Sequence, residues 1–272
     1  MTTGPTEQLA RRIRRHVVTM TNRSNASHVG GALSMADILA VLYGEVLDVD
    51  PARPQSPDRD RFILSKGHGC AALYAVLAER GFFPLEWLDE YHVDGGRFAG
   101  HTTHTAAPGI ELSTGSLGHG LPVGCGMALA ARRDGRSHRV FVVISDGECD
   151  EGSTWEAALF APQHSLDNLV VVVDYNKIQS FGDVADVIDL EPLADKWRSF
   201  GWAAQEVDGH DPAELRRVLT AVPLETGKPS CIVAHTVKGK GVSFMEGKLQ
   251  YHYTPARGDE LDRALAELRD EP

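Results

Sequence analysis

Two polar residues, Asp146 and Asn176, each directly follow an apolar run, and together they could build a cation site. VFVVIS spans 140–145 before Asp146, and LVVVVDY spans 169–175 before Asn176. If both runs are strands of one βαβ unit, a right-handed crossover brings their carboxyl ends close together. A carboxylate, an amide oxygen and a nearby backbone carbonyl suit Mg²⁺ or Ca²⁺, which would take its remaining ligands from a phosphate. Taken singly, Asp146 would more often cap a helix and Asn176 make a turn.

The chain also has twelve histidines, several of them in glycine-rich loops between the expected strands and helices. Imidazole moves protons and binds hydroxyl groups near neutral pH, so a histidine in such a loop is a candidate for catalysis as well as for an ordinary surface hydrogen bond. His101 and His104 stand three residues apart, a spacing that could also indicate zinc. No cysteine or carboxylate stands nearby at a familiar zinc-ligand spacing.

Alternating strands and helices must position these residues. Apolar runs predict strands at 61–65, 139–145, 168–176, 201–207 and 230–236, and periodic or small-residue segments predict helices at 8–21, 36–47, 67–81, 121–133, 153–165 and 211–222. Strands that are apolar on both faces and separated by helices predict an α/β fold with a parallel sheet sandwiched by helices. Ligands of such sheets bind beyond the carboxyl ends of the strands, where Asp146 and Asn176 stand.

Composition argues against several classes of function. A formal charge of −11 leaves no broad basic field for nucleic acid. No apolar stretch approaches the ~20 residues that span a bilayer, and the N-terminus lacks the apolar core of a secretory signal. The four cysteines are scattered without a CxxC pair, which argues against a disulfide framework and a zinc knuckle. We therefore expect a cytoplasmic protein that binds neither nucleic acid nor membrane.

Several segments, spread in order over nearly the whole chain, resemble those of one enzyme family. SDGECDEG at 145–152, followed by VDYNKI at 173–178, resembles the thiamine diphosphate signature in the form that transketolases carry. Further segments resemble transketolase N-terminal segments in the same order: SNASHVGGALS, FILSKGHG, FAGH, APGIELSTGSLGHG, LADKWRSFGW, EVDGHD and HTVKGKGVSFME. The resemblance implies the thiamine diphosphate-binding fold of that family.

Thiamine diphosphate, held through Mg²⁺ or Ca²⁺, is the cofactor that the resemblance implies. Its metal ligands would be Asp146, Asn176 and the backbone oxygen of Ile178. A residue without a side chain lets the backbone approach phosphate, which fits the position of Gly147. The cofactor contacts implied by the resemblance are His68, Gly118, Gly147, Asp146 and Asn176.

The sequence departs from the family pattern at two cofactor segments. Ser145 replaces the first glycine of the usual GDG, and a serine fits there if its φ stays negative. His119 stands where glutamine is common. His68 opens an expected helix, so a simple capping role stays open for it.

The resemblance also implies roles for histidines and acids near the cofactor. His28, His101 and His252 match the histidines that line the transketolase substrate channel. Glu151 and Glu156 resemble carboxylates that couple two cofactor sites at a subunit interface. The resulting catalytic set is His28, His101, His252, Glu151 and Glu156. The neighbouring Glu148 and Asp150 are expected to face solvent.

The implied activity is that of a transferase, which moves a two-carbon ketol unit from a ketose or ketose phosphate donor to an aldose acceptor. One alternative is the α subunit of a 2-oxo acid dehydrogenase complex, which shares the metal motif but is expected to lack the KGHG and VKGKGVSF segments in this order. A non-catalytic thiamine diphosphate-binding homologue is the other alternative. The presence of Asp146, Asn176, His28 and His68 counts against it.

We expect the chain to work only with a second polypeptide. Residues 1–272 read as a single diphosphate-binding domain, and the tail ELDRALAELRDEP is too short for a second domain of ~100 residues. The partner would be a C-terminal transketolase subunit that carries the pyrimidine-binding domain and an activating glutamate. Because the cofactor would sit between modules from different chains, a two-fold α₂β₂ assembly is expected.

Overall fold

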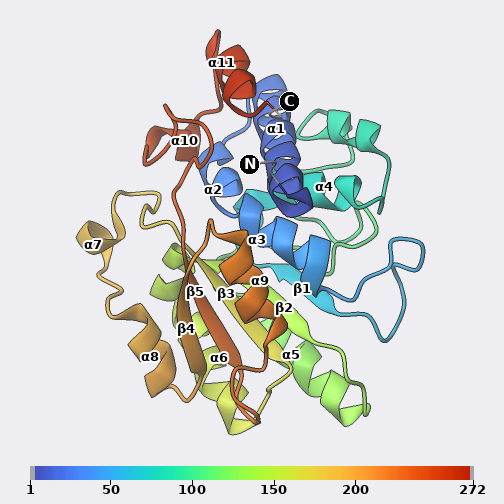
Figure 1. Ribbon diagram of the computed structural model, residues 1–272, viewed down its shortest axis with the longest axis vertical. Helices are drawn as coiled ribbons and strands as arrows, with labels where there is room; N and C mark the ends of the chain where they lie inside the picture. The colour runs from blue at the N-terminus through green and yellow to red at the C-terminus, as the bar shows by residue number, and fades with distance from the viewer. Residues whose placement is uncertain (1–3, 270–272) are drawn as a thin grey trace.

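A five-stranded parallel sheet organises the protein, whose computed structural model describes residues 4–269. The strands stand in the order β1-β2-β3-β5-β4, so the last strand lies between the third and the fourth (Figure 1). Their bounds are β1 Arg61–Leu64, β2 Val140–Ser145, β3 Leu169–Tyr175, β4 Ala203–Asp208 and β5 Ser230–His235. The parallel sheet with its flanking helices confirms the predicted α/β class.

Within residues 4–269, six of the α-helices correspond to predicted segments, with differences at their ends, and five have no predicted counterpart. The α-helices are α1 Pro5–Ser24, α2 Val29–Ser34, α3 Ala36–Val41, α4 Cys70–Glu79, α5 Gly120–Arg133, α6 Gly152–Gln163, α7 Val184–Val187, α8 Leu193–Ser199, α9 Pro212–Thr220, α10 Gln250–Tyr253 and α11 Glu260–Glu267. The predicted helix 36–47 ends as α3 at Val41 and continues as a π-helical turn over Leu42–Val46. Sequence patterns do not predict helix α2, because its glycines disfavour helix locally. Its burial in the fold overrides that preference.

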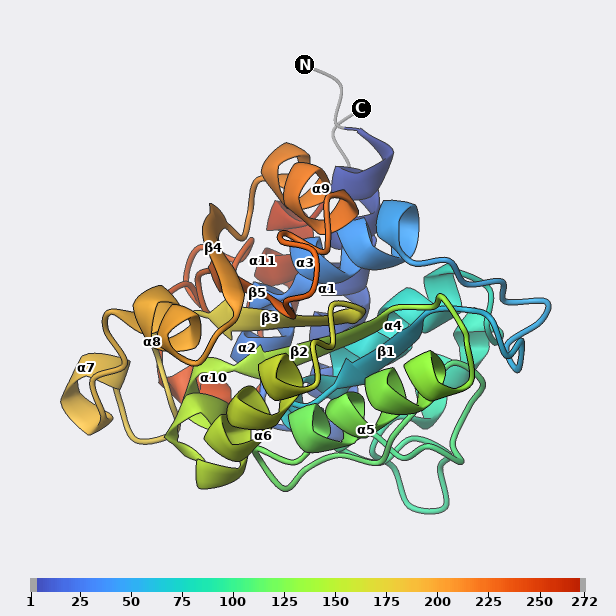
Figure 2. The ribbon, with the colours of Figure 1, turned by 90° about the horizontal axis from the view of Figure 1, so that it is seen from below.

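Two apolar cores lie on opposite faces of the sheet. Residues of β2 alternate between them, with Phe141 and Val143 in one core and Val142 and Ile144 in the other. Helices α5 and α6 cover one face, and α1, α3 and α9 cover the other (Figure 2). Because both faces are covered, every residue of β3 is buried, which explains the apolar run LVVVV at its start.

The strand register brings the expected site residues together. Ser145 of β2 pairs with Asp174 of β3, so the residues that follow the two strands leave the sheet side by side. Ser145 itself has a φ of −90°, which meets the condition under which serine replaces glycine there. In residues 4–269, no helix is both long enough and apolar enough to cross a bilayer.

Candidate active site

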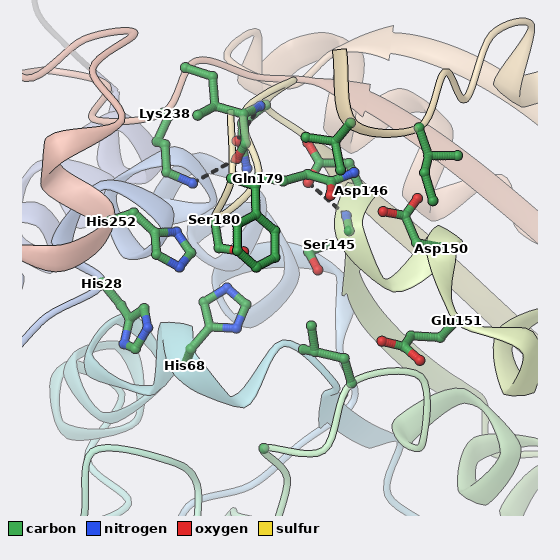
Figure 3. A pocket seen from close by; sticks show the side chains of 18 of the residues that line it. His28, His68, Ser145, Asp146, Asp150, Glu151, Gln179, Ser180, Lys238 and His252 are labelled. Carbon is green, nitrogen blue, oxygen red and sulfur yellow. Dashed lines mark hydrogen bonds between the residues drawn. The ribbon is translucent and has the colours of Figure 1, made fainter. Parts of the chain in front are cut away.

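A cavity of about 480 Å³ lies at the carboxyl ends of β2 and β3 (Figure 3). The predicted site residues in its lining are His28, His68, His101, Asp146, Gly147, Glu151, Asn176, Ile178 and His252. They come from segments spread from the start of α2 to α10. The fold thus gathers residues that are far apart in the sequence around one space.

Asp146 and Asn176 lie close together, as the strand ends predicted. Asp146 is 2% exposed, and its carboxylate accepts N–H groups from Gly147 and Lys177, each at 2.8 Å. Asn176 is also buried, and its Oδ1 accepts the Ile178 N–H at 3.3 Å in a tight turn. Lys177 at the centre of this turn has a φ of +68°, which bends the chain sharply behind Asn176.

Asp146 carries more negative charge than its surroundings readily stabilise. Burial, and then the neighbouring carboxylate of Asp174, raise its pKa to about 6. Lys66 and Lys238 act in the opposite direction through their positive charge. A cation bound beside Asp146 would relieve this imbalance, because an adjacent positive charge favours the ionised carboxylate.

Lys238 contacts the third residue of the predicted metal set, Ile178. Its ammonium donates to the carbonyl oxygen of Ile178 at 2.9 Å, so this predicted metal ligand already faces a positive charge. Burial, and then the nearby Lys66, lower the pKa of Lys238 to about 8. Within residues 4–269, no group of three His, Cys, Asp or Glu side chains could hold a metal ion. The predicted set does not depend on such a group, since Asp146 is its only acidic or histidine member.

Four histidines form one cluster in the cavity. The ring centroid of His28 lies 4.9 Å from His252, 5.2 Å from His68 and 5.9 Å from His101. Burial is the main reason that the pKa of His28 falls to about 4 and that of His252 to about 3. Burial also holds the pKa of His68 well below its usual value. These imidazoles are therefore neutral at pH 7 and can accept as well as donate hydrogen bonds.

The backbone and neighbouring residues hold this cluster in place. His28 has a φ of +70°, and its N–H donates to the carbonyl of His252 at 2.8 Å. Its ring nitrogen Nδ1 lies 2.9 Å from the hydroxyl of Ser27. His104 is exposed and bonds Ser113 at 2.8 Å, and it lies outside the cavity lining.

Gly118 is required by its own backbone and packing. Its φ is +78°, and a Cβ there would lie 2.5 Å from the Ser153 hydroxyl oxygen. Leu117, which precedes it, lines the cavity. Gly147 differs, since a Cβ there would meet only Gln179 at 3.7 Å, an ordinary contact. The fold of this chain does not demand glycine at 147, and its missing side chain leaves space in the cavity.

The acidic cluster after β2 divides between the interior and the surface. The prediction that Glu148 faces solvent is wrong, because its side chain is fully buried and turns back to accept the N–H groups of Ser145 at 2.9 Å and Gly118 at 3.0 Å. Its burial raises its pKa. Asp150 is partly exposed and lines the cavity. Glu151 is exposed at the cavity edge, and Glu156 is exposed on α6.

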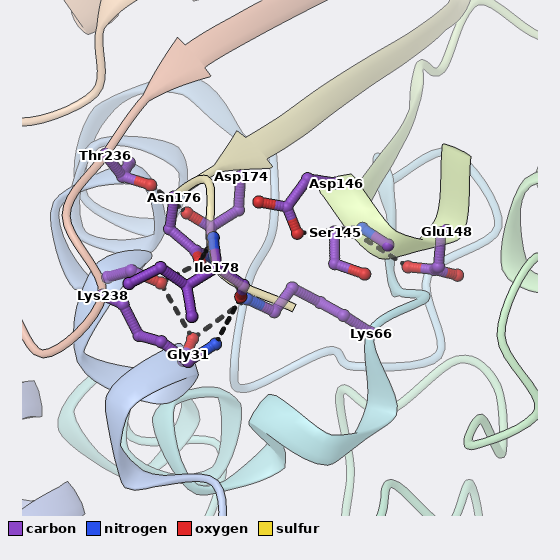
Figure 4. Close-up of polar contacts among 12 residues, drawn as sticks. Gly31, Lys66, Ser145, Asp146, Glu148, Asp174, Asn176, Ile178, Thr236 and Lys238 are labelled. Carbon is purple, nitrogen blue, oxygen red and sulfur yellow. Dashed lines mark hydrogen bonds and ion pairs between the residues drawn. The ribbon is translucent and has the colours of Figure 1, made fainter. Parts of the chain in front are cut away.

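Sequence reasoning missed three charged residues, of which Lys238 lines the cavity and Lys66 and Asp174 lie outside its lining. Lys66 and Asp174 form a fully buried ion pair, and Lys238 contacts Ile178 (Figure 4). Burial opposes ionisation of Asp174, but Lys66 and the surrounding hydrogen bonds hold its pKa below its usual value. One signal was available, since Asp174 is a lone charge inside the apolar run LVVVVDY.

Comparison with known proteins agrees with this geometry. Residues 6–271 match the family described as the transketolase, thiamine diphosphate binding domain. The chain belongs to the transketolase family. It is 43% identical to an apulose-4-phosphate transketolase subunit of Actinobacillus succinogenes, over 97% of this chain and 96% of that protein. It is 44% identical to the 6-deoxy-6-sulfo-D-fructose transketolase subunit SqwG of a Clostridium species, over 95% and 94% of the two chains.

Solved transketolase structures share the fold. The transketolase of Leishmania mexicana superposes with a TM-score of 0.90 at 32% sequence identity, covering 98% of this chain and 42% of that one. The bovine transketolase-like protein 2 is 37% identical over 95% of this chain and 42% of its own length. The chain therefore corresponds to the thiamine diphosphate-binding part of longer transketolases and to nearly the whole length of the Actinobacillus and Clostridium relatives.

Proposed function

We propose that this chain is the thiamine diphosphate-binding subunit of a split transketolase, a transferase that moves a two-carbon ketol unit from a ketose donor to an aldose acceptor. The observation that carries the proposal is the cavity at the strand ends, whose lining contains Asp146, Asn176 and Ile178 together with the histidine cluster. The relatives are named as transketolase subunits, which favours this reading over part of a 2-oxo acid dehydrogenase and over a non-catalytic homologue.

The chemistry of the donor set fits a hard divalent cation. Asp146 and Asn176 and the carbonyl of Ile178 supply oxygen atoms only, which Mg²⁺ and Ca²⁺ prefer. The raised pKa of Asp146, caused by burial and by Asp174, marks a carboxylate that a cation would stabilise. These three residues would hold Mg²⁺ or Ca²⁺, with a diphosphate completing its coordination.

The cavity also has room and polarity for the diphosphate. Gly147 presents backbone without a side chain, and Lys238 and His68 add polar groups to the same wall. Gly118, with its positive φ, would let the chain turn directly after Leu117, which lines the cavity beside the proposed cofactor. Bound thiamine diphosphate supplies a nucleophilic carbon atom for breaking and forming the carbon–carbon bond.

The neutral histidines would act on the sugar. His28, His101 and His252 lie in the cavity and could bind the hydroxyl groups of donor and acceptor. A neutral imidazole can take a proton from a hydroxyl group and return it, which an imidazolium cannot do. Their lowered pKa values, due mainly to burial, keep them in the base form across neutral pH.

We also propose a partner subunit that carries the pyrimidine-binding domain. Its support is the 42% coverage of full-length transketolases and the relatives named as subunits. The outer face of α5 and α6 exposes Leu159, Phe160 and Val123 beside Glu156. Exposed apolar residues of this kind are typical of a protein-binding surface. Two copies of each chain are the simplest assembly, with Glu151 and Glu156 near the junction. The four cysteines are buried and unpaired, which supports the cytoplasm as the compartment.

Reconstitution tests the proposal directly. The full chain is purified alone and with a C-terminal transketolase subunit, then assayed with thiamine diphosphate, Mg²⁺ and a panel of ketose donors by mass spectrometry. We expect two-carbon transfer only from the mixture. Turnover by this chain alone would contradict the split-enzyme reading, and failure of the mixture to bind thiamine diphosphate would contradict the cofactor.

A further inference from the structure

Asp174 and Lys66 are unusual because they place opposite charges in the interior, outside the cavity lining. Both side chains are 0% exposed and form an ion pair. Removing two charges from water costs free energy that their attraction often fails to recover, and apolar residues of similar volume are often as stable. The stability of the fold alone therefore does not account for this pair.

The Asp174 carboxylate receives hydrogen bonds from four side chains (Figure 4). Ser34 donates to Oδ2 at 2.6 Å and Asn176 at 3.4 Å. Lys66 also donates to Oδ2, and Thr236 donates to Oδ1. A carboxylate offers about four lone-pair sites, the same number as these donors, and three of the donors converge on Oδ2.

Each donor belongs to a segment that also carries a cavity residue. The pairs, donor first, are Ser34 with His28, Lys66 with His68, Asn176 with Ile178, and Thr236 with Lys238. The Lys66 ammonium also donates to the Gly31 carbonyl at 3.0 Å, which ties its loop to α2. A single buried carboxylate thus joins the segments that carry the proposed cofactor and channel residues.

The same carboxylate selects the orientation of the Asn176 amide. The Nδ2 group of Asn176 faces Asp174, and its Oδ1 is turned toward the Ile178 N–H. A flipped amide would bring its oxygen against the carboxylate of Asp174, which is unfavourable because both atoms carry negative charge. It would also present an NH₂ group in place of the oxygen that a cation needs.

We propose that Asp174, paired with Lys66, is a positioning residue for the cofactor site. It orients the Asn176 oxygen and holds His68 and Lys238 in register with it, without itself touching the cofactor. This inference rests on the proposed function, because it requires that the Asn176 oxygen binds a cation together with a diphosphate.

Asp174→Asn in the full chain, assembled with its partner subunit, provides the main test. An asparagine has one acceptor oxygen, and its NH₂ group opposes one of the converging donors. We expect the thiamine diphosphate Kd, measured by calorimetry with Mg²⁺, to rise at least about tenfold, or about 1.4 kcal/mol. The Mg²⁺ concentration for half-maximal cofactor binding should rise as well, which a merely loosened fold would not require.

Asp60→Asn is the matched control. Asp60 is also a buried acid, 3% exposed, but it binds Arg139 at the amino ends of the strands. We expect this variant to keep the parental Kd and Mg²⁺ requirement to within about twofold, because its hydrogen bonds do not reach the cavity. An equal rise in both variants would overturn the proposal, since it would show a general effect of destabilising the sheet.

Lys66→Met combined with Asp174→Asn removes both buried charges and covers the case in which the single variant does not fold. Replacement of both partners avoids an unpaired charge, so we expect cooperative unfolding close to that of the parent. The Kd should stay at least about tenfold raised. A parental Kd in either folded variant, or failure of the double variant to fold, would overturn the positioning role. If the parental assembly itself binds no thiamine diphosphate, the proposed function fails instead.

Discussion

Buried carboxylates at the two edges of the sheet have different hydrogen-bond partners. At the amino edge, Asp60 accepts the Arg139 N–H at 2.8 Å and its guanidinium at 2.6 Å, together with the Asp48 N–H at 3.0 Å. At the carboxyl edge, Asp146 accepts backbone N–H groups, and its pKa rises to about 6 because of burial and of Asp174. The amino edge neutralises its acid with an arginine of the same chain, whereas the carboxyl edge leaves the charge of Asp146 available to the proposed cation.

This difference explains how one sheet can serve both stability and binding. An arginine that satisfies Asp60 holds the starts of β1 and β2 together without any ligand. The carboxylate of Asp146 is costly to ionise in the unliganded chain, so a bound cation would stabilise the folded state as well as the site. We therefore expect substitutions at the carboxyl edge to change cofactor binding, and substitutions at the amino edge to change the free energy of unfolding.

Asp146→Ala should have the largest effect on cofactor binding. A small effect would contradict the proposed difference between the two edges of the sheet. The variant loses the only carboxylate of the proposed metal set, so we expect the thiamine diphosphate Kd of the assembled enzyme to rise at least about a hundredfold, or about 2.7 kcal/mol. Calorimetry with Mg²⁺ measures this change. An unchanged Kd would remove Asp146 from the cofactor site.

His28→Ala and His101→Ala should separate the channel from the cofactor site. Loss of a group that transfers protons typically lowers turnover by 10²–10⁴-fold, and we expect a fall of about tenfold to a hundredfold for each variant, because the remaining histidines share the cavity. Thiamine diphosphate affinity should change little. Steady-state kinetics over a range of donor concentrations, combined with calorimetry, checks both parts. Parental rates in the double variant would refute the channel role.

Asp60→Asn should show the opposite pattern at the amino edge. The substitution removes the charged acceptor of part-buried hydrogen bonds from Arg139 and Asp48, so we expect the unfolding free energy to fall by about 1–3 kcal/mol. Denaturant unfolding of the isolated chain measures this. A stability equal to that of the parent would mean that the Asp60 contacts add little and that the contrast between the edges is smaller than the geometry indicates.

The pH dependence of stability should show the smallest effect. Burial lowers the pKa of His28 from 6.5 to about 4, so between these values the unfolded chain binds a proton that the folded chain does not. Stability from the neutral ring is therefore complete above about pH 6.5 and is lost as the pH falls toward 4. Unfolding measured across this range should have a shallower slope in His28→Ala, and an identical slope would contradict the buried, neutral state of this ring.

Much of the fold and the cofactor edge could be predicted from short patterns. The apolar runs before Asp146 and Asn176 indicated parallel strands, because a strand buried on both faces has apolar residues at successive positions. The expectation for Glu148 failed for a physical reason. A run of acids reads as a solvated surface, but a carboxylate that turns back to cap N–H groups is stable in the interior. The inserted position of β5 also had no local signal.

The element types, the polar residues at the strand ends and the family resemblance could be inferred along the chain, because they depend on periodicity and on local motifs. Which distant segments meet depends on the three-dimensional fold. The four-donor arrangement around Asp174 and the cluster of His28, His68, His101 and His252 both include contacts between residues more than a hundred positions apart in the chain, such as Ser34 with Asp174 and His28 with His252. Burial then sets their charge state, since desolvation acts only on groups that the completed fold removes from water.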